Sequence, residues 1–380
     1  MDFELNDEHR AIVEMAEAFA SEAIAPHALD WDRDRVFPVA VIRRAAELGL
    51  GGIMVSERFG GSGLGRIESV LVYEALAKGC PAISAYLSIH NMVGTMIDRF
   101  GTDAQKQTYL PQLCSGAMLS SYCLTEPGSG SDAAALQTRA EKDGDFYVLT
   151  GQKMFISGAG ATDLYVVMAR TGGPGPKGIS AFLIEKDAPG LSFGANEKKM
   201  GWNAQPTRTV QMDQVRVPAS AMLGAEGTGF KLAMAALDGG RTSIAACSLG
   251  GAQAAFDKAL AYMGERKAFG QKLTEFQALQ FALAEMATEL EVSRTFLWRA
   301  ATALDQKSPR AGQLCAMAKK HVTDAGFDVA NRALQLHGGY GYLADYGVEK
   351  IVRDLRVHQI LEGTNEIMRL IIARVLIAEA

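Results

Sequence analysis

The stretch "AEKDGDFYVLTGQKMFISG", residues 140–158, indicates the fold of the middle of the chain. Asp143-Gly144 stands between two runs of extended character, which is a strong signal for a β-hairpin. Three more short runs of β-forming residues follow, each bounded by Gly or Pro: "TDLYVVMAR", "GISAFLIEK" and "TVQMDQVRVP". We therefore predict a compact β-domain over residues 119–225, to which Trp202 also belongs.

On both sides of this region, apolar residues recur every three or four positions, which is the period of a helix. Toward the N-terminus one such stripe ends at Pro26, and a second begins near Pro38. Toward the C-terminus a seam over residues 276–297 suits helix-bundle packing. The chain is thus predicted to be a multidomain α+β protein: a helical domain over 1–118, the β-domain, and a second helical domain over 226–380.

The composition is that of an ordinary soluble globular protein, with 380 residues, 48% hydrophobic and 21% charged. The net charge of -5 and the lack of a dense Lys/Arg tract argue against a nucleic-acid partner. Five scattered cysteines without CxxC spacing predict reduced thiols, and six histidines without HxxxH or HxxE spacing predict no metal site.

The N-terminal sequence "MDFELNDEHR" lacks a basic segment followed by an apolar one, and it is acidic. We therefore expect neither a signal peptide nor a transit peptide. No apolar run approaches the roughly 20 residues that span a bilayer. These features predict a soluble, cytoplasmic protein with no membrane partner.

Near the C-terminus, "QILEGTNEIMRL" (residues 359–370) places one acid, Glu362, between an apolar pair and a glycine. One interpretation is a helix start, with Thr364 or Asn365 as the cap and Glu366 at the positive end of the helix dipole. The other is a catalytic base whose pKa is tuned by apolar surroundings. The helix start explains Glu366 better than Glu362, and this stretch alone leaves both interpretations open.

Two Gly-rich stretches near the start of the β region could contact a ligand. "YCLTEPGSGSD" (residues 122–132) carries hydroxyls on Thr125 and Ser131, and glycines that allow close backbone approach to an anion or carbonyl. "MFISGAG" (residues 154–160) places an aromatic face, Phe155, near a hydroxyl, which suits a planar ring. The plainer alternatives are a Pro-Gly-Ser turn and a strand followed by a Gly turn.

A third Gly-rich stretch, "GPGPKG" (residues 173–178), fits the GxGxxG pattern of dinucleotide-binding loops. It contains two prolines and precedes a strand-like run rather than a helix. The dinucleotide fingerprint needs a helix N-terminus to hold the pyrophosphate, so we exclude a Rossmann domain.

Two stretches of the C-terminal region could also contact a ligand. "ERKAFGQKLTEFQ" (residues 265–277) contains Arg266, whose guanidinium suits a diphosphate, and Gln277, which could bond a ring or ribose. In "ALQLHGGYGY" (residues 333–342) a helix should end at two glycines and expose backbone to a ligand. A solvated charge cluster and a Gly C-cap are the alternatives.

Together these stretches resemble the acyl-CoA dehydrogenase family over essentially the full chain. The resemblance is carried, in the family's order, by "YCLTEPGSGSD", "FISGAG", "ERKAFGQ", "LQLHGGYGY" and "ILEGTNEIMR". It implies an N-terminal all-α domain, a middle β-barrel-like domain and a C-terminal four-helix bundle, in a homotetramer with one FAD per subunit. It also implies that electrons pass to an electron-transfer flavoprotein.

The resemblance implies that Glu362 removes the α-proton of an acyl thioester while a hydride leaves the β-carbon for flavin N5. In the family, the main-chain N–H of this glutamate and a flavin ribityl hydroxyl stabilise the enolate-like transition state. Gly363 would leave room beside the thioester. Isovaleryl-type relatives carry the base on a bundle helix, at a position that matches Gly240 here, and a glycine cannot act as a base.

The remaining ligand contacts are also implied by the resemblance. It assigns FAD contacts to Tyr122, Leu124, Thr125, Gly130, Ser131, Phe155, Ile156, Ser157, Arg266, Phe269, Phe276, Gln277, Gln335, Leu336, His337, Gly338, Gly339, Thr364, Asn365 and Glu366. It assigns contacts with the acyl-CoA to Ser131, Asp238, Gly239, Gly240, Arg241, Gly363 and Arg374. The group from Arg266 to Gln277 would reach the cofactor of a neighbouring subunit.

Four more stretches resemble the subgroup that oxidises isobutyryl-CoA to methacrylyl-CoA in valine breakdown: "LSIHNM", "RTGGPGPKGIS", "GWNAQPTR" and "LDGGRTSIAACSLG". The alternatives are 2-methylbutyryl-CoA or butyryl-CoA as substrate, O₂ as acceptor, or a non-catalytic acyl-CoA-binding or assembly protein. The presence of Glu362 argues against a non-catalytic protein. It also argues against a nitroalkane-oxidase-type member, which would carry Asp there.

Overall fold

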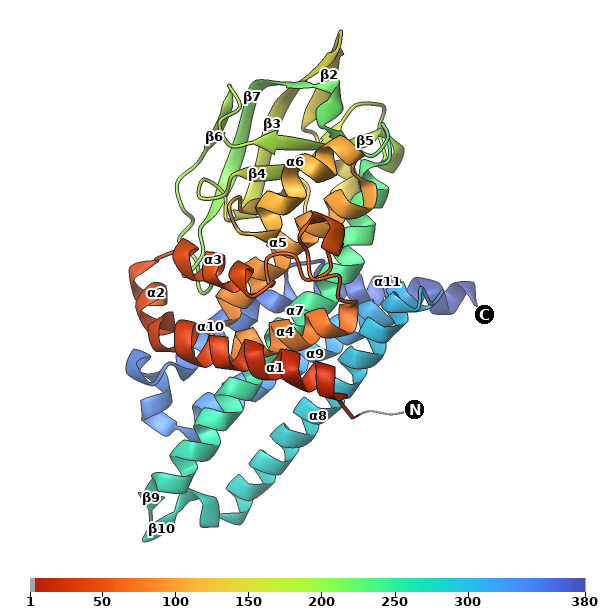
Figure 1. The fold of residues 1–380 in the computed structure, drawn as a ribbon. Helices are drawn as coiled ribbons and strands as arrows, with labels where there is room; N and C mark the ends of the chain where they lie inside the picture. Colours follow the sequence, from red (N-terminus) through yellow and green to blue (C-terminus); the bar gives the residue numbers. More distant parts are fainter. Residues whose placement is uncertain (1–3, 380) are drawn as a thin grey trace.

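The N-terminal part of the protein is helical in the computed structural model, which describes residues 4–379 (Figure 1). Its helices are α1 (Asp7–Phe19), α2 (Ala28–Asp34), α3 (Val39–Glu47), α4 (Arg66–Gly79), α5 (Pro81–Phe100) and α6 (Asp103–Cys114). Pro26 does not end the helical path as predicted. It lies in a 3-10 turn, Ala25–His27, and α2 begins directly after it, because proline is tolerated in the first turn of a helical segment.

The middle part is an eight-stranded mixed sheet. Its strands are β1 (Ser120–Cys123), β2 (Arg139–Asp143), β3 (Phe146–Ser157), β4 (Leu164–Arg170), β5 (Ile179–Glu185), β6 (Leu191–Phe193), β7 (Thr207–Pro218) and β8 (Met222–Leu223). The strand order is β6-β7-β3-β2-β4-β5-β8, with β1 paired in parallel to β4. No pairing joins β6 to β8 in the described chain, so the sheet is open rather than a closed barrel.

The quoted hairpin is confirmed as β2 and β3, which pair antiparallel from Asp143 opposite Phe146. Gly144 begins the turn with φ of 60°, a left-handed conformation that favours glycine. The exclusion of a Rossmann domain is also confirmed, because residues 173–178 lead through a short 3-10 turn into β5 rather than into a helix.

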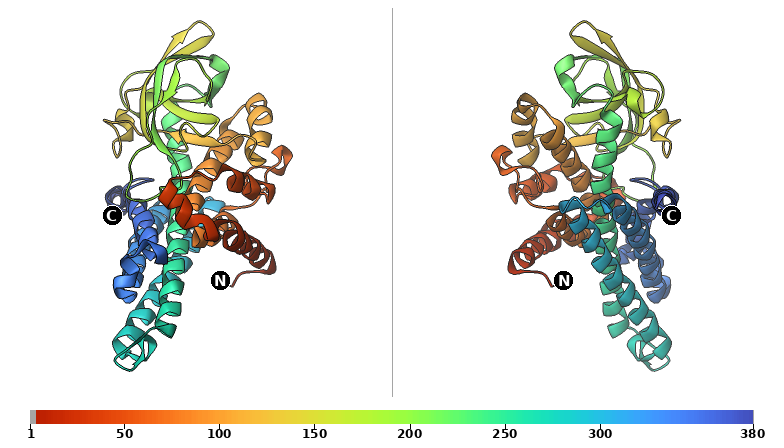
Figure 2. Two further views of the ribbon diagram at one scale, coloured as in Figure 1. Left: turned by 90° about the vertical axis from the view of Figure 1, so that its left-hand side faces the viewer. Right: turned by 90° about the vertical axis from the view of Figure 1, so that its right-hand side faces the viewer.

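The C-terminal part contains the longest helices. They are α7 (Gly229–Glu265), α8 (Gln277–Asp305), α9 (Ala311–Leu336), α10 (Val348–Arg356) and α11 (Asn365–Ala378), with a small hairpin of β9 (Lys267–Ala268) and β10 (Gln271–Lys272) between α7 and α8. The 37 residues of α7 span about 55 Å. Figures 1 and 2 show this helix running from the β-sheet down to the β9–β10 hairpin, where it projects with α8 beyond the other helices.

The helical core is built around α7, which packs against α4, α5, α8 and α9. On α8 the predicted seam is buried from Met286 to Leu297, whereas its first turns lie in the projecting part and remain partly exposed. All five cysteines are buried with free thiols, as predicted. None of the helices over residues 4–379 is long and apolar enough to cross a membrane.

Trp202 is the clearest departure from the predicted β module. It lies in the β region of the sequence, but its ring is part of the helical core. Its main-chain N–H donates to Asp354 Oδ1 at 2.6 Å, and its indole Nε1 donates to His358 Nε2 at 3.2 Å. These partners lie more than 150 residues away, so local sequence patterns could not reveal them.

Candidate active site

Glu362 lies in the sharp turn before α11. Glu362 and Gly363 adopt φ of 57° and 85°, two successive left-handed conformations, of which the one at Glu362 is strained for a residue with a side chain. Thr364 is the helix cap and accepts a hydrogen bond from the Ile367 N–H at 3.3 Å. The helix-start interpretation is therefore confirmed for Thr364, and it leaves Glu362 outside the helix and without a role in the cap.

The carboxylate of Glu362 is held in a low-polarity environment. The residue as a whole is half-buried, but its Oε2 atom is buried and has no hydrogen-bond partner among residues 4–379. Burial raises the pKa of Glu362 to about 7, although the charges of Arg241 and Lys319 act in the opposite direction. A carboxyl with a pKa near neutrality is a good acceptor for a proton at neutral pH.

Gly240 on α7 lets the carboxylate of Glu362 lie against the helix backbone at this point. A Cβ atom at residue 240 would lie only 2.4 Å from Glu362 Oε2. Gly240 cannot itself act as a base, but it leaves room for the carboxylate of Glu362.

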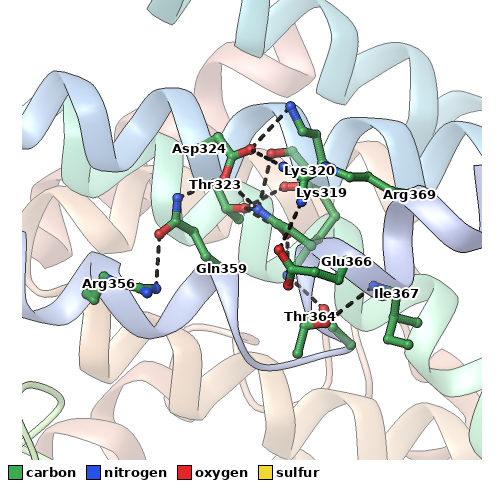
Figure 3. Close-up of polar contacts among 12 residues, drawn as sticks. Lys319, Lys320, Thr323, Asp324, Arg356, Gln359, Thr364, Glu366, Ile367 and Arg369 are labelled. Carbon is green, nitrogen blue, oxygen red and sulfur yellow. Dashed lines mark hydrogen bonds and ion pairs between the residues drawn. The ribbon is translucent and has the colours of Figure 1, made fainter. Parts of the chain in front are cut away.

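A buried lysine holds the turn that carries Glu362. Lys319 of α9 is fully buried, and its Nζ donates to Gly363 O and to Asn365 Oδ1, both at 2.8 Å. Asn365 in turn donates to Thr323 Oγ1 at 3.0 Å and to Asp324 Oδ1 at 2.7 Å (Figure 3). Burial lowers the pKa of Lys319 to about 8, so it is still mainly a cation at pH 7.

A cavity beside Glu362 runs between α5 and α7. Its space for water-sized molecules is about 20 Å³, and the wider hollow of about 360 Å³ includes open solvent. The lining residues are Met54, Arg66, Ser88, Met92, Thr95, Met96, Arg99, Phe100, Ala235, Ala236, Gly240 and Ser243. Gly240 belongs both to this lining and to the contact with Glu362, so the carboxylate lies next to a residue of the lining, although Glu362 is not itself part of it.

The residues predicted to contact acyl-CoA are partly brought together here. Asp238 to Arg241 form one turn of α7, where Arg241 Nη1 donates to Asp238 Oδ1 at 2.5 Å. The Nε atom of Arg241 is buried and has no partner in the part of the chain that the structure describes. Arg374, in contrast, is exposed three turns into α11, and the structure does not bring it to this group.

Tyr122 connects the β-sheet to the site. Its hydroxyl is buried without a partner in the described range. Burial and the negative charge of Glu362 together raise the pKa of Tyr122 well above its usual value, so the two side chains are electrostatic neighbours. On the adjoining strand, Phe155 has φ of 60° and is 60% exposed, while the Ser121 hydroxyl bonds the carbonyl of Ser157 at 2.6 Å.

The loop that follows β1 is held from inside by an ion pair that the sequence analysis did not single out. Lys153 Nζ, fully buried on β3, donates to Glu126 Oε1 at 2.7 Å and to Leu124 O at 3.1 Å. Burial alone raises the pKa of Glu126, but Lys153 and the main-chain donors that Glu126 binds lower it below the usual value. Glu126 and Lys153 are 27 residues apart in the sequence, so no local pattern indicates that they form an ion pair.

The outer face of this loop is open. An added Cβ at Gly128 or Gly130 would have no atom within 4 Å. Thr125 is half-buried and Ser131 is exposed, so their hydroxyls remain available next to the exposed ring of Phe155. An aromatic face, free hydroxyls and uncovered backbone fit a flat, polar ring system such as the isoalloxazine of FAD.

The predicted FAD residues of the segments 266–277 and 335–339 form a second group at the far end of α7, whereas Thr364, Asn365 and Glu366 lie at the start of α11 beside Lys319. Arg266 has its guanidinium 5.5 Å from the Tyr340 ring centroid, and the two residues line a pocket with Gln335, Leu336, His337, Gly338 and Gly339. Phe269 is 97% exposed at the β9–β10 tip. Arg266 follows Gly240 by 26 residues along α7, which is about 39 Å of helix, so this second group lies far from Gly240 and the turn of Glu362 that contacts it.

Three family models cover nearly the whole chain. They are those of the acyl-CoA dehydrogenase N-terminal domain at residues 6–117, middle domain at 121–215 and C-terminal domain at 227–377. The chain belongs to the acyl-CoA dehydrogenase family. It is therefore an FAD-dependent oxidoreductase that acts on acyl-CoA.

Among individual proteins, the chain is 52% identical to the mitochondrial isobutyryl-CoA dehydrogenase of Bos taurus, over 99% of this chain and 90% of that protein. It is 37% identical to the solved butyryl-CoA dehydrogenase of Megasphaera elsdenii, with a TM-score of 0.96 over 99% and 100% of the two chains. A structure reported for the electron transferring flavoprotein of Acidaminococcus fermentans matches at 40% identity, with a TM-score of 0.97 over 99% of each chain.

Proposed function

We propose that this protein oxidises isobutyryl-CoA to methacrylyl-CoA, with Glu362 as the base that removes the α-proton. The observation that carries the proposal is the buried, unpartnered Oε2 of Glu362 at the edge of a cavity, on a carboxyl whose pKa is about 7. The identity of 52% to a protein named for isobutyryl-CoA supports the choice of substrate.

The surroundings of Glu362 set its basicity from two directions. Burial makes the carboxylate a stronger base than a solvated one, because the ion loses its hydration and the protonated form does not. The charges of Arg241 and Lys319 lower the pKa of this buried carboxyl to about 7, so that a large fraction of it is ionised at neutral pH. The resulting carboxylate accepts the α-proton, which becomes the hydroxyl proton of the Glu362 carboxyl group.

A base alone cannot remove a proton from so weak an acid as a thioester α-carbon. A hydrogen-bond donor has to stabilise the negative charge that develops on the thioester oxygen. The main-chain N–H of Glu362 has no acceptor within residues 4–379, so it remains available for this role. The Lys319 bonds to Gly363 and Asn365 hold that backbone in place.

When FAD is bound, it supplies the acceptor for the hydride that leaves the β-carbon of the substrate. The residues that would hold its ring are Phe155, Ser157 and the loop from Leu124 to Ser131, with Tyr122 between them and Glu362. The buried pair Lys153–Glu126 keeps this loop in its shape.

The separation of the two groups of FAD residues supports an oligomer. Arg266, Phe269 and the segment Gln335–Gly339 would bind the cofactor of a neighbouring subunit, in the homotetramer that the family resemblance implies. We propose an electron-transfer flavoprotein as the acceptor that reoxidises the cofactor. The place in valine catabolism and the cytoplasmic location remain predictions from the sequence.

Anaerobic titration of the purified holoenzyme with isobutyryl-CoA, butyryl-CoA and 2-methylbutyryl-CoA tests this function by the loss of visible flavin absorbance. Fastest bleaching by isobutyryl-CoA is the expected result. Faster bleaching by another thioester would retain the chemistry and refute the substrate. No bleaching by any of the three would refute the proposed function, and wild-type kcat in Glu362→Gln would refute the assignment of the base.

A further inference from the structure

Arg66, the first residue of α4, is buried in a way that calls for an explanation. It is only 9% exposed, and its main-chain N–H is fixed by two bonds to the Asp305 carboxylate at 2.8 and 2.9 Å. Its guanidinium makes no hydrogen bond or ion pair with any residue from 4 to 379, but it lines the cavity beside Glu362. A buried guanidinium without a partner is costly, so water or a ligand group must solvate it from the cavity.

The guanidinium lies next to the reacting end of the cavity. A Cβ atom at Gly239 would lie 2.4 Å from Arg66 Nη2, just as one at Gly240 would lie 2.4 Å from Glu362 Oε2. Two successive glycines of α7 thus give access to a buried cation and to the candidate base. Of the other large side chains of the lining, Met54, Met92, Met96 and Phe100 are apolar or aromatic and suit an uncharged acyl group, whereas Arg99 is a second cation and is exposed.

We propose that Arg66 is the specificity residue that limits this enzyme to short acyl groups. The inference rests on the proposed function. A short branched acyl group leaves the guanidinium in contact with water held in the cavity. Each further methylene of a longer chain would replace that water with a group that cannot hydrogen-bond, so a longer chain is rejected by desolvation of the cation as well as by size.

The alternative chemistry for such a cation is a carboxylate at the end of the acyl group. Arg99 is exposed, and the other large side chains of the lining are apolar or aromatic, which favours the short uncharged acyl group instead. A panel of isobutyryl-CoA, butyryl-CoA, hexanoyl-CoA, octanoyl-CoA and glutaryl-CoA separates the two possibilities.

The test compares kcat/KM across this panel for the wild-type holoenzyme and for Arg66→Met, which removes the charge but keeps most of the length. We expect the ratio of hexanoyl-CoA to isobutyryl-CoA activity to rise at least tenfold in Arg66→Met. Arg66→Lys should keep the wild-type ratio, because it keeps a hydrated cation. The matched control is Arg299→Met, which removes an exposed arginine of α8 and should leave the ratio within twofold.

An unchanged ratio in Arg66→Met, with normal FAD content and Tm, would overturn the inference. Preference of the wild type for glutaryl-CoA, lost in Arg66→Met, would overturn it in favour of carboxylate recognition. A wild-type enzyme that already prefers octanoyl-CoA would also overturn the inference about Arg66. It would leave the proposed oxidation of acyl-CoA in place. If no acyl-CoA reduced the flavin, the proposed function would fail. The length limit would then be measured from the affinity of each thioester, followed by the change that its binding causes in the flavin spectrum.

Discussion

Gly240→Ala tests the geometry of the site directly, since it adds one methyl group where the carboxylate now lies. The new Cβ would lie 2.4 Å from Glu362 Oε2 and 2.9 Å from its Cδ. Real Cβ contacts essentially never fall below 3.0 Å, so the carboxylate has to move by at least 0.6 Å (3.0 − 2.4), and by 1.0 Å (3.4 − 2.4) to reach ordinary contact. The backbone accepts alanine, because Gly240 lies inside α7 with ordinary helical φ.

The expected result is a loss of activity without a loss of folding. A displacement of about 1 Å at the reacting groups lowers a rate by about 100-fold. We expect Gly240→Ala to retain FAD, to melt no lower than the wild type because alanine favours a helix interior by about 0.5–1 kcal/mol, and to lose about 100-fold in kcat. Anaerobic stopped-flow flavin reduction by isobutyryl-CoA measures the rate.

Gly264→Ala is the matched control for this experiment. It makes the same substitution in the same helix, at a position where an added Cβ has no atom within 4 Å. Gly264→Ala should therefore keep wild-type kcat. Wild-type kcat in Gly240→Ala, or an equal loss in both variants, would refute the reasoning.

The remaining predictions concern the charges of the site. Glu362→Gln should raise the Tm much more at about pH 9 than at about pH 4, because a carboxyl whose pKa is raised from 4.5 to about 7 costs folding stability progressively as pH rises from 4.5 to about 7, and fully above that; a pH-independent difference would contradict the burial argument. The kcat/KM of the wild type should rise as pH passes about 7, and a flat profile would argue against Glu362 as the base. Lys319→Met should move that rise to higher pH, since it removes a cation that lowers the pKa of Glu362, whereas Lys258→Met, at an exposed position of α7, should leave it unchanged; a shift to lower pH would contradict this. Lys153→Met leaves Glu126 without its cation and should weaken FAD retention at least tenfold, as measured by flavin absorbance after dilution and filtration; full retention would show that the pair does not shape the loop.

Much of the fold was predictable because its signals are local. The β2–β3 hairpin follows from a turn sequence, and α9 ends at the Gly338-Gly339 pair as predicted. Pro26 shows where a local signal misleads, because a proline that disfavours the middle of a helix is acceptable at the start of the next one. The sequence left the helix cap open between Thr364 and Asn365, and the structure places it at Thr364.

The groups that tune the site were not predictable in the same way, because each is defined by a distant partner. Lys319 looks like any helical lysine in sequence, yet its ammonium bonds the turn 44 residues later. Lys153 binds Glu126 across two strands, and Arg66 meets Gly239 only because α4 packs on α7. A charged residue in a helix or strand pattern is usually a solvated surface residue, so burial is the information that the sequence lacks.

The pKa of about 7 at Glu362 results from two opposing effects of its surroundings. Burial without Arg241 and Lys319 would raise the pKa further and leave the group protonated at neutral pH, while the same two cations beside a solvated carboxylate would make it too weak a base. The base therefore needs both effects at once. Gly240 allows the close approach to α7, and Lys319 anchors the turn from the opposite side, so the two helices that bring these residues together fix position and basicity in a single arrangement.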